Sequence, residues 1–291
     1  MKRFLLISLF AALLAAGCSD METPDDPDNN PPTDQNPSDD NNNPSDEGGC
    51  VIYYTTTDDK IAIFVMNGKI VTNNTYENEI GTIKLSTPIT VFGNISAEFA
   101  SNHNLKSVSI PDCVTRIASY ALEHADSLES VTLPNSITSI GSAAFGGCHR
   151  LMSINIPDNV TTIDSWAFSS CFSLTSIDIP DSVTTIGPLA FVGCVNLKSI
   201  TIGKGVKTIG AEAFGGCGLD SDGCTIYCHS IVPPKLESEY THPYDEQLNS
   251  NLPPFRYDDI ISIYVPTGSV EAYKRADIWS ELSDKIVGYN F

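Results

Sequence analysis

Apolar residues recur along this chain at a fixed spacing of 23 residues. One register is mostly aromatic and holds Phe99, Leu122, Phe145, Phe168, Phe191 and Phe214. Others hold Leu105, Leu128, Leu151, Leu174 and Leu197, or Ile117, Ile140, Ile163, Ile186 and Ile209. A period in the twenties indicates one supersecondary unit per repeat, which buries its apolar face only when a neighbour stacks on it. The pattern therefore predicts a solenoid that presents an extended surface.

Each repeat predicts a short strand, and in all units but the one with Gly203 a proline follows it directly. In the unit starting at Leu151, Ile154 and Ile156 share one face of a strand because alternate side chains point the same way. Pro157 lacks the amide that a longer strand would need. A second extended segment is expected around Ile163, followed by one helical or 3₁₀ turn over 165–168.

Two further features of the repeat carry predictions. The position after the Ile163 register holds glycine in three units but Ala118 and Asp164 in two others, so a positive φ is not required there. The phenylalanines are expected to stack at the strand spacing of about 4.8 Å and to form a continuous aromatic spine.

The unit Leu-x-x-Ile-x-Ile-Pro-x-x-Val-x-x-Ile-x-x-x-Ala-Phe-x-x-Cys resembles the leucine-rich repeat in the variant known from BspA-like surface proteins of oral and gut bacteria. The match covers residues 99–219 and ends there, because Asp220 stands where the next leucine is due. The resemblance implies a leucine-rich repeat solenoid, an α/β-type superhelix rich in β-structure. Its 23-residue coils would carry short strands and single helical or 3₁₀ turns, with a cap at each end.

Residues 50–98 predict an N-terminal β cap, since an uncovered end would expose the core. Val51–Thr55 and Ile61–Val65 are strand-like, and Asn67-Gly68 is a turn signal. The segment 83–91 looks like a degenerate first coil with altered spacing.

Residues 220–291 predict a C-terminal cap. Within it, 263–266 repeats the strand-then-proline phrase, and 267–269 offers an N-cap to a short helix carrying Ala272, Tyr273 and Trp279. This segment is similar to the closing segment of the same surface-protein family. Residues 236–256 are acidic, contain proline and lack the period, which predicts an inserted loop.

Residues 1–17 predict a signal peptide: two basic residues, an apolar run, then Ala15-Ala16-Gly17 before Cys18. The segment resembles the lipobox of bacterial lipoproteins, although Ala15 stands where that family usually has leucine. The resemblance implies a lipid on Cys18; the alternative is an ordinary signal peptide. No later apolar run is long enough for a transmembrane helix, so acyl chains in the outer membrane would be the anchor.

Residues 18–49 predict a disordered tether, because 19–49 holds ten acids and six prolines but no aromatic, lysine or arginine. Near polyproline extension it would reach about 90 Å. Its start, Cys18–Glu22, is similar to the acidic signal of surface-exposed lipoproteins of the Bacteroides group. The net charge of −20 makes nucleic acid a poor partner.

Four cysteines recur at the repeat spacing: Cys148, Cys171, Cys194 and Cys217. Disulfides are one interpretation in an exported chain, but a ladder of small buried side chains is favoured because Asn102 and Ala125 fill the same register. A looser group, Cys217, Cys224, Cys228 and His229, lacks the usual spacing of zinc ligands. Core packing or a local disulfide explains that group, and no metal site is predicted.

The sequence predicts no catalytic site and no cofactor. Cys148-His149 could suggest a thiol and its base, but adjacent residues in a turn rarely face each other. Gly-x-Ser-x-Gly, His-Glu-x-x-His and phosphate-loop motifs are all missing from the sequence.

The outward positions of the strands are the candidate recognition surface. An all-serine row, typical of a solvated sheet face, holds Ser107, Ser130, Ser153, Ser176 and Ser199. The second row varies in chemistry, and we call it the outward row: Ser109, Thr132, Asn155, Asp178 and Thr201.

The favoured hypothesis is a lipid-anchored surface protein that binds a protein ligand and serves in adhesion; the resemblance implies host matrix or bacterial surface proteins as partners. The alternative is a surface glycan-binding lipoprotein for polysaccharide capture. That function needs exposed aromatics, for which the inserted loop and its flank offer Tyr240, His242, Tyr244, Phe255 and Tyr257. A third reading is an architectural spacer in the envelope.

Overall fold

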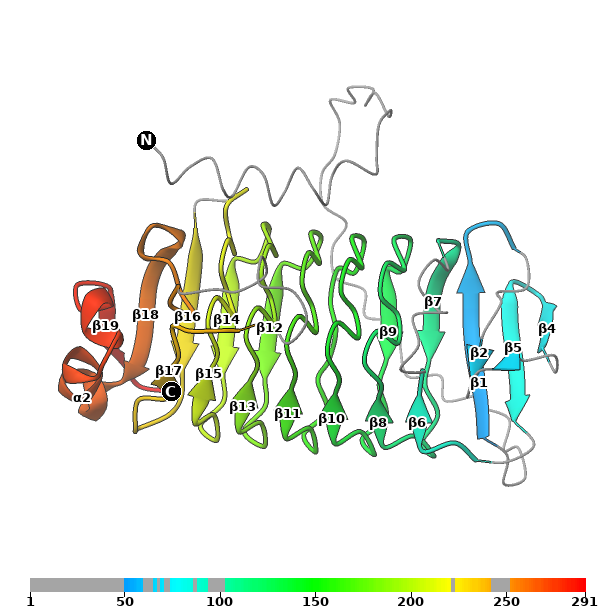
Figure 1. Ribbon diagram of the computed structural model, residues 1–291, viewed down its shortest axis with the longest axis horizontal. Coiled ribbons are helices and arrows are strands. Elements are labelled where there is room, and N and C mark those ends of the chain that lie inside the picture. Colours follow the sequence, from blue (N-terminus) through cyan, green and yellow to red (C-terminus); the bar gives the residue numbers. More distant parts are fainter. Residues whose placement is uncertain are drawn as a thin grey trace. The chain divides into compact units, whose positions relative to one another are not determined.

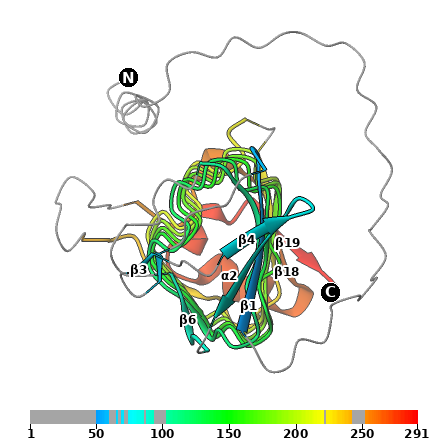
Figure 2. The same cartoon turned by 90° about the vertical axis from the view of Figure 1, so that its right-hand side faces the viewer.

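The computed structural model describes residues 50–59, 65–66, 69–70, 74–85, 88–93, 103–220, 223–241 and 252–291, with only the backbone at 65–66 and 69–70. The predicted signal peptide and tether lie outside the described residues. The described residues belong to one compact unit, 46–291. It is a β-solenoid whose coils stack side by side (Figure 1) and nearly superimpose when seen along the stack (Figure 2).

The longest strands form the main sheet on one side of the solenoid. It has two parts: in the first, β7 (Leu105–Ser109) pairs in parallel with β9 (Ser130–Thr132). In the second, parallel pairing joins, in this order, β12 (Ser176–Ile179), β14 (Ser199–Ile202), β16 (Cys224–Cys228), β18 (Ile260–Pro266) and β19 (Ile286–Tyr289). The coil at 151–157 lies between β9 and β12 and is extended without strand pairing, although Ile154 and Ile156 are buried as expected.

A second sheet of two-residue strands forms another side. Its parallel strands are β6 (Val91–Phe92), β8 (Arg116–Ile117), β10 (Ser139–Ile140), β11 (Thr162–Ile163), β13 (Thr185–Ile186), β15 (Thr208–Ile209) and β17 (Lys235–Leu236). Threonine side chains reinforce it: Thr138 Oγ1 donates to the Thr115 carbonyl at 3.0 Å, and Thr161 Oγ1 to the Thr138 carbonyl at 3.2 Å. This sheet confirms the second extended segment of each repeat.

The third side differs from the single helical turn expected over 165–168. It is a series of turns in which Trp166 has a φ of 63°, in the left-handed region that a helical turn excludes. Residues at the same register in other coils share this conformation: Tyr120, Ala143, Leu189 and Glu212. The N–H groups of Phe168 and Ser170 donate to the carbonyls of Ala190 and Val192 in the next coil, at 2.7 and 2.8 Å.

The glycines after the isoleucine register have another role. Gly141, Gly187 and Gly210 do not have a positive φ, which confirms the expectation. A Cβ on Gly141 or Gly187 would lie 2.6 Å from the backbone nitrogen of Ser119 or Ser165, so these glycines permit a close approach of neighbouring coils.

The core follows the predicted aromatic spine. Phe145, Phe168, Phe191 and Phe214 are fully buried, and consecutive rings stack with centroids 5.1–5.2 Å apart and planes within 7°. Phe99 lies outside the described residues. Beside the spine, each ladder thiol donates to a spine carbonyl of the preceding coil: Cys171 Sγ to Phe145 at 3.3 Å, and Cys194 Sγ to Phe168 at 3.2 Å. The spine and the ladder thus tie neighbouring coils together.

At the N-terminal end of the solenoid, strands that precede the repeats in the sequence extend the main sheet. β1 (Cys50–Thr56) contains the expected strand-like run and pairs antiparallel with both β7 and β5 (Ile80–Leu85), while β4 (Asn74–Glu77) completes the edge. A small hairpin pairs β2 (Val65–Met66) with β3 (Lys69–Ile70). In the segment expected to form a degenerate first coil, β6 pairs in parallel with β8, but β5 does not lie next to β7 because β1 separates them.

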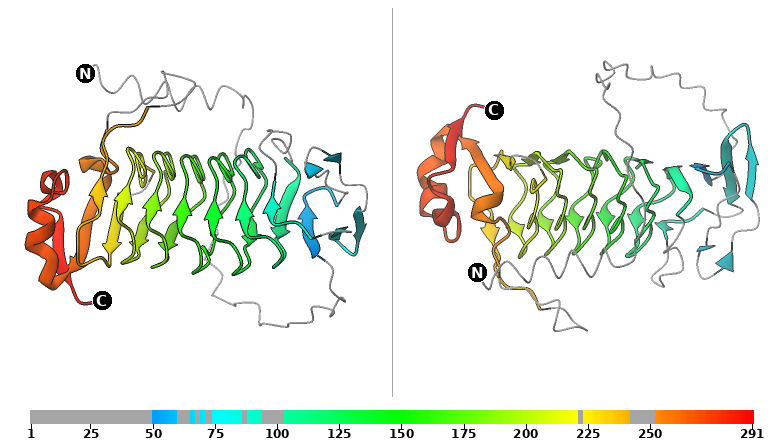
Figure 3. Two further views of the ribbon diagram at one scale, coloured as in Figure 1. Left: turned by 60° about the horizontal axis from the view of Figure 1, so that its bottom comes forward. Right: turned by 90° about the horizontal axis from the view of Figure 1, so that it is seen from above.

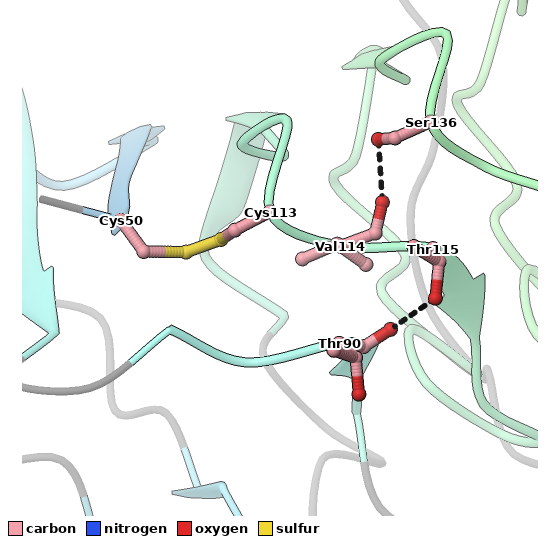
Figure 4. Close-up of a disulfide and its surroundings, with 6 residues drawn as sticks. All are labelled: Cys50, Thr90, Cys113, Val114, Thr115 and Ser136. Carbon is pink, nitrogen blue, oxygen red and sulfur yellow. Dashed lines mark hydrogen bonds between the residues drawn. A yellow bond between two sulfur atoms is a disulfide. The ribbon is translucent and has the colours of Figure 1, made fainter. Parts of the chain in front are cut away.

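A disulfide that the sequence reasoning missed fastens this cap. Cys50 of β1 is bonded to Cys113, which follows Pro111 in the first regular coil, with a Cα–Cα distance of 6.2 Å (Figure 4). The next residues continue the inter-coil bonding, since Thr115 Oγ1 donates to the Thr90 carbonyl at 3.1 Å. The bond therefore joins the cap to the repeat region.

The C-terminal end is closed by helical segments (Figure 3). They are η2 (Tyr257–Asp259), η3 (Thr267–Ser269), α2 (Val270–Arg275) and η4 (Trp279–Leu282). The expected short helix is confirmed as α2, but Ser269 makes no side-chain cap and Trp279 lies beyond the helix in η4. Tyr273 and Trp279 are buried and donate to the carbonyls of Ser230 and Pro234, at 2.8 and 2.7 Å. Across the described ranges, none of the helices has the length and apolar character of a bilayer span.

We predict that Phe168→Ala lowers the free energy of unfolding by about 3–5 kcal/mol, because it removes a ring stacked on both sides and leaves a cavity. Ser176→Ala on the exposed face should change it by less than about 0.5 kcal/mol. Urea denaturation of both variants measures this. Similar losses for the two would mean that the inward and outward positions are assigned incorrectly.

We also predict that replacing both Cys50 and Cys113 by serine costs about 2–4 kcal/mol, because the bond closes a loop with a sequence separation of 63. Dithiothreitol should lower the stability of the natural chain by a similar amount and leave the double variant unchanged. The other described cysteines are buried free thiols, so reduction acts only on this bond. Equal stability with and without reductant would contradict a stabilising role.

Candidate binding surface

The outward row lies on the exposed face of the main sheet. Thr132, Asn155 and Asp178 are exposed, while Ser109 and Thr201 are partly covered. The strand register pairs Ser109 with Thr132 and Asp178 with Thr201, so these pairs are direct neighbours. Within the described residues, the Asp178 carboxylate has neither an ion-pair nor a hydrogen-bond partner, which leaves it available to a ligand.

A charged pair borders the row where the strands end. Lys204 Nζ lies 2.7 Å from Asp181 Oδ2, and the Lys204 backbone N–H donates to Asp181 Oδ1 at 2.9 Å. The hydrogen bond from the Lys204 side chain lowers the pKa of Asp181, with smaller help from nearby His229. Both side chains are at least half exposed. This pair places a carboxylate and an ammonium group beside the row, in contact with water.

The outward row continues beyond Thr201 into an aromatic cluster that the sequence reasoning missed. Tyr227 of β16 pairs with Thr201 on one side and Tyr264 of β18 on the other. The rings of Tyr227 and Tyr264 are stacked, with centroids 5.1 Å apart and planes 13° apart. Tyr289 of β19 meets Tyr264 edge-on at 5.5 Å. Two more rings complete this aromatic cluster: His229 and Phe291, with centroids 4.1 Å apart.

The aromatic cluster escaped the sequence reasoning because insertions interrupt the 23-residue spacing beyond Leu219. The signal that could have revealed it is local alternation. Tyr227 lies between Ile226 and Cys228, and Tyr264 lies between Ile263 and Val265, in the same phrase that places Thr201 outward. Such cross-strand aromatic pairs stabilise a sheet, and the part of their rings that stays exposed is also available to a ligand.

The described aromatic candidates of the inserted loop and its flank differ in exposure. Phe255 is 1% exposed and extends the spine, stacking on Phe214 at 5.2 Å, so the expectation that it is a surface aromatic is wrong. Tyr257 is exposed, but its hydroxyl donates to Asp284 and Lys285 lies over its ring. Tyr240 is partly covered. His242 and Tyr244 lie outside the described residues.

In the adjacent pair Cys148-His149, the cysteine lies in the core and the histidine lies outside it. Cys148 is buried and donates to the Leu122 carbonyl at 3.2 Å, whereas His149 stacks on Phe172 at 4.6 Å. Burial raises the pKa of Cys148 far above its ordinary value and lowers the pKa of His149. The two therefore do not form a nucleophile and base.

The C-terminal thiols are also core residues. Cys224 and Cys228 point inward from β16, and burial raises their pKa values to about 12 and about 11. Cys228 Sγ lies 3.1 Å from the Tyr273 hydroxyl. Among the described residues, no group of histidine, cysteine and acidic side chains is arranged to hold a metal ion.

The chain is similar to several solved structures. The crystal structure of the pneumococcal vaccine antigen PcpA aligns with a TM-score of 0.52 at 21% identity, covering 78% of this chain and 50% of that chain. This chain therefore spans about half the length of that antigen. A leucine-rich cell surface protein from Faecalibacterium prausnitzii aligns with a TM-score of 0.44 at 22% identity, covering 69% and 63% of the two chains. At such identities the likeness concerns the fold.

The repeats have a specific counterpart among protein families. No curated protein matches the chain significantly. A family model described as a BspA type leucine rich repeat region, with six copies, matches residues 69–220, which is more than half of the chain. The match includes every regular coil with the aromatic spine and cysteine ladder. The chain belongs to the BspA-type leucine-rich repeat family.

Proposed function

We propose that this chain is a lipid-anchored protein of the bacterial cell surface that binds a protein ligand through the outward row and serves in adhesion. The observation that carries the proposal is a row of small polar side chains along one face of the solenoid, with an unpaired carboxylate at Asp178. Such a face offers hydrogen bonds at a regular spacing of about 4.8 Å without large groups in the way. Repeat scaffolds of this kind typically bind rather than catalyse.

The proposed location rests on the N-terminal sequence and the family. Cys18 would carry the lipid, the acidic segment 19–49 would hold the body away from the outer membrane, and BspA-like relatives are surface proteins. The partner would be a host matrix protein or another bacterial surface protein. Glycan capture is the second candidate function, favoured by the aromatic cluster at the end of the main sheet.

We predict that Asp178→Lys weakens binding to a protein found on a matrix-protein array by about tenfold or more, because reversing an interfacial charge turns attraction into repulsion. The urea midpoint should stay unchanged, since Asp178 is exposed. Glu281→Lys, an exposed charge reversal in η4, is the matched control. Loss of binding only in the double variant Tyr240→Ala, Tyr244→Ala would move the site to the inserted loop, and no binding at all would favour a spacer.

We predict that Cys18 is lipidated and that Cys50 is not, because Cys50 is already bonded to Cys113 and no small-residue run precedes it. Cells grown with an alkyne palmitate should label the natural chain and leave Cys18→Ala unlabelled. Label that persists in the variant would contradict the assignment.

Surface exposure requires a separate measurement. Protease added to intact cells should release the body by cutting within 19–49, a segment rich in acids and prolines. Full protection from the protease would place the protein on the periplasmic side of the outer membrane.

A further inference from the structure

We propose that the aromatic cluster is a second binding site, which takes a sugar ring of a neutral glycan on the face of Tyr227. The inference rests on glycan capture, the second candidate function above, and names the ring and the class of glycan involved. The site lies on the same sheet face as the outward row, where β14, β16 and β18 pair in register.

Tyr227 is partly covered: Tyr264 stacks on one face of its ring, and Tyr289 approaches it edge-on with centroids 6.4 Å apart. Tyr227 and Tyr264 are nearly parallel and follow the spacing of adjacent strands, so the second face of Tyr227 is turned toward the next residue of the row. That residue is Thr201, which is too small to continue the stack. The stacked tyrosines therefore end at Thr201, and we infer above this threonine a space that a flat ring would fill.

A pyranose ring fits the chemistry of this space. It has a face of C–H bonds, which an aromatic face attracts, and a rim of hydroxyl groups that need hydrogen-bond partners. Asp178 lies one strand beyond Thr201, with Asp181 and Lys204 at the ends of the same strands. In the part of the chain described, the hydroxyls of Tyr227, Tyr264 and Tyr289 also have no hydrogen-bond partner. The site therefore offers an aromatic face to the C–H bonds of the sugar ring and polar groups to its hydroxyls.

The surrounding charge favours a neutral glycan over an acidic one. Asp178 is the strand neighbour of Thr201, and the second nearby carboxylate, on Asp181, is paired with the one ammonium group beside it, on Lys204. An apolar protein side chain is a poorer occupant, because it would bury these carboxylates without offering them hydrogen bonds.

Isothermal titration calorimetry of the full chain tests the proposal with four neutral hexasaccharides: maltohexaose, cellohexaose, xylohexaose and mannohexaose. We expect at least one to bind with a Kd of about 1 mM or tighter. Tyr227→Ala should weaken it about tenfold or more, whereas Tyr227→Phe should keep most of the affinity. Tyr120→Ala, an exposed tyrosine on the third side, is the matched control and should change nothing.

A second variant keeps the test independent of any unfolding caused by Tyr227→Ala. Thr201→Tyr fills the space with another stacked ring, so it should abolish binding without lowering the urea midpoint. Binding that survives Thr201→Tyr, tighter binding of heparin than of every neutral hexasaccharide, or no binding by any of the four would overturn the proposal. Loss of the array-identified protein ligand in Tyr227→Ala, with no glycan bound, would assign the cluster to the protein site. None of these results changes the effect expected of Asp178→Lys on a protein ligand.

Discussion

Each coil of this solenoid can bury its apolar residues only against the coils on either side, and the rest of the structure depends on that constraint. The backbone bonds of the main and second sheets run between coils, as do the bonds from Phe168 and Ser170 to the following coil. The phenylalanine rings stack across the same boundaries. Because the contacts are between neighbours, stability accumulates coil by coil and both ends need covering.

The constraint explains where extra residues are tolerated. Eighteen residues lie between Leu236 and Phe255, against four between Ile209 and Phe214, yet Phe255 takes the next place in the spine and the Phe214 N–H donates to the Pro254 carbonyl. An insertion at a turn leaves the stacked registers intact as long as the chain returns in register. At the other end, β1 enters between β5 and β7, and the Cys50–Cys113 bond fixes it to the first regular coil.

The repeat made most of the fold predictable, because inward positions carry the same chemistry every 23 residues. The left-handed conformation at Trp166 was not predictable, since the same register holds tyrosine, alanine, leucine and glutamate elsewhere and so gives no compositional signal. The Cys50–Cys113 pairing depends on strand β1 crossing to a distant neighbour, which periodicity does not encode. The burial of the repeated cysteines could be predicted from their register. Their hydrogen bonds to carbonyls of the aromatic spine could not, because the spacing does not show which backbone atoms a thiol reaches.

The candidate binding surface, too, could be predicted from the sequence only in part. The outward row was correctly placed up to Thr201 because the period holds there, and its continuation into Tyr227 and Tyr264 was lost when the period failed. In physical terms, strand pairing continues where sequence spacing does not: β16 and β18 keep the register of the sheet although their connections differ in length. Inward positions of such a scaffold are committed to the core, so differences in recognition must arise from outward positions on paired strands. A change from threonine to tyrosine along one row alters the ligand chemistry of the face without altering the sheet that presents it.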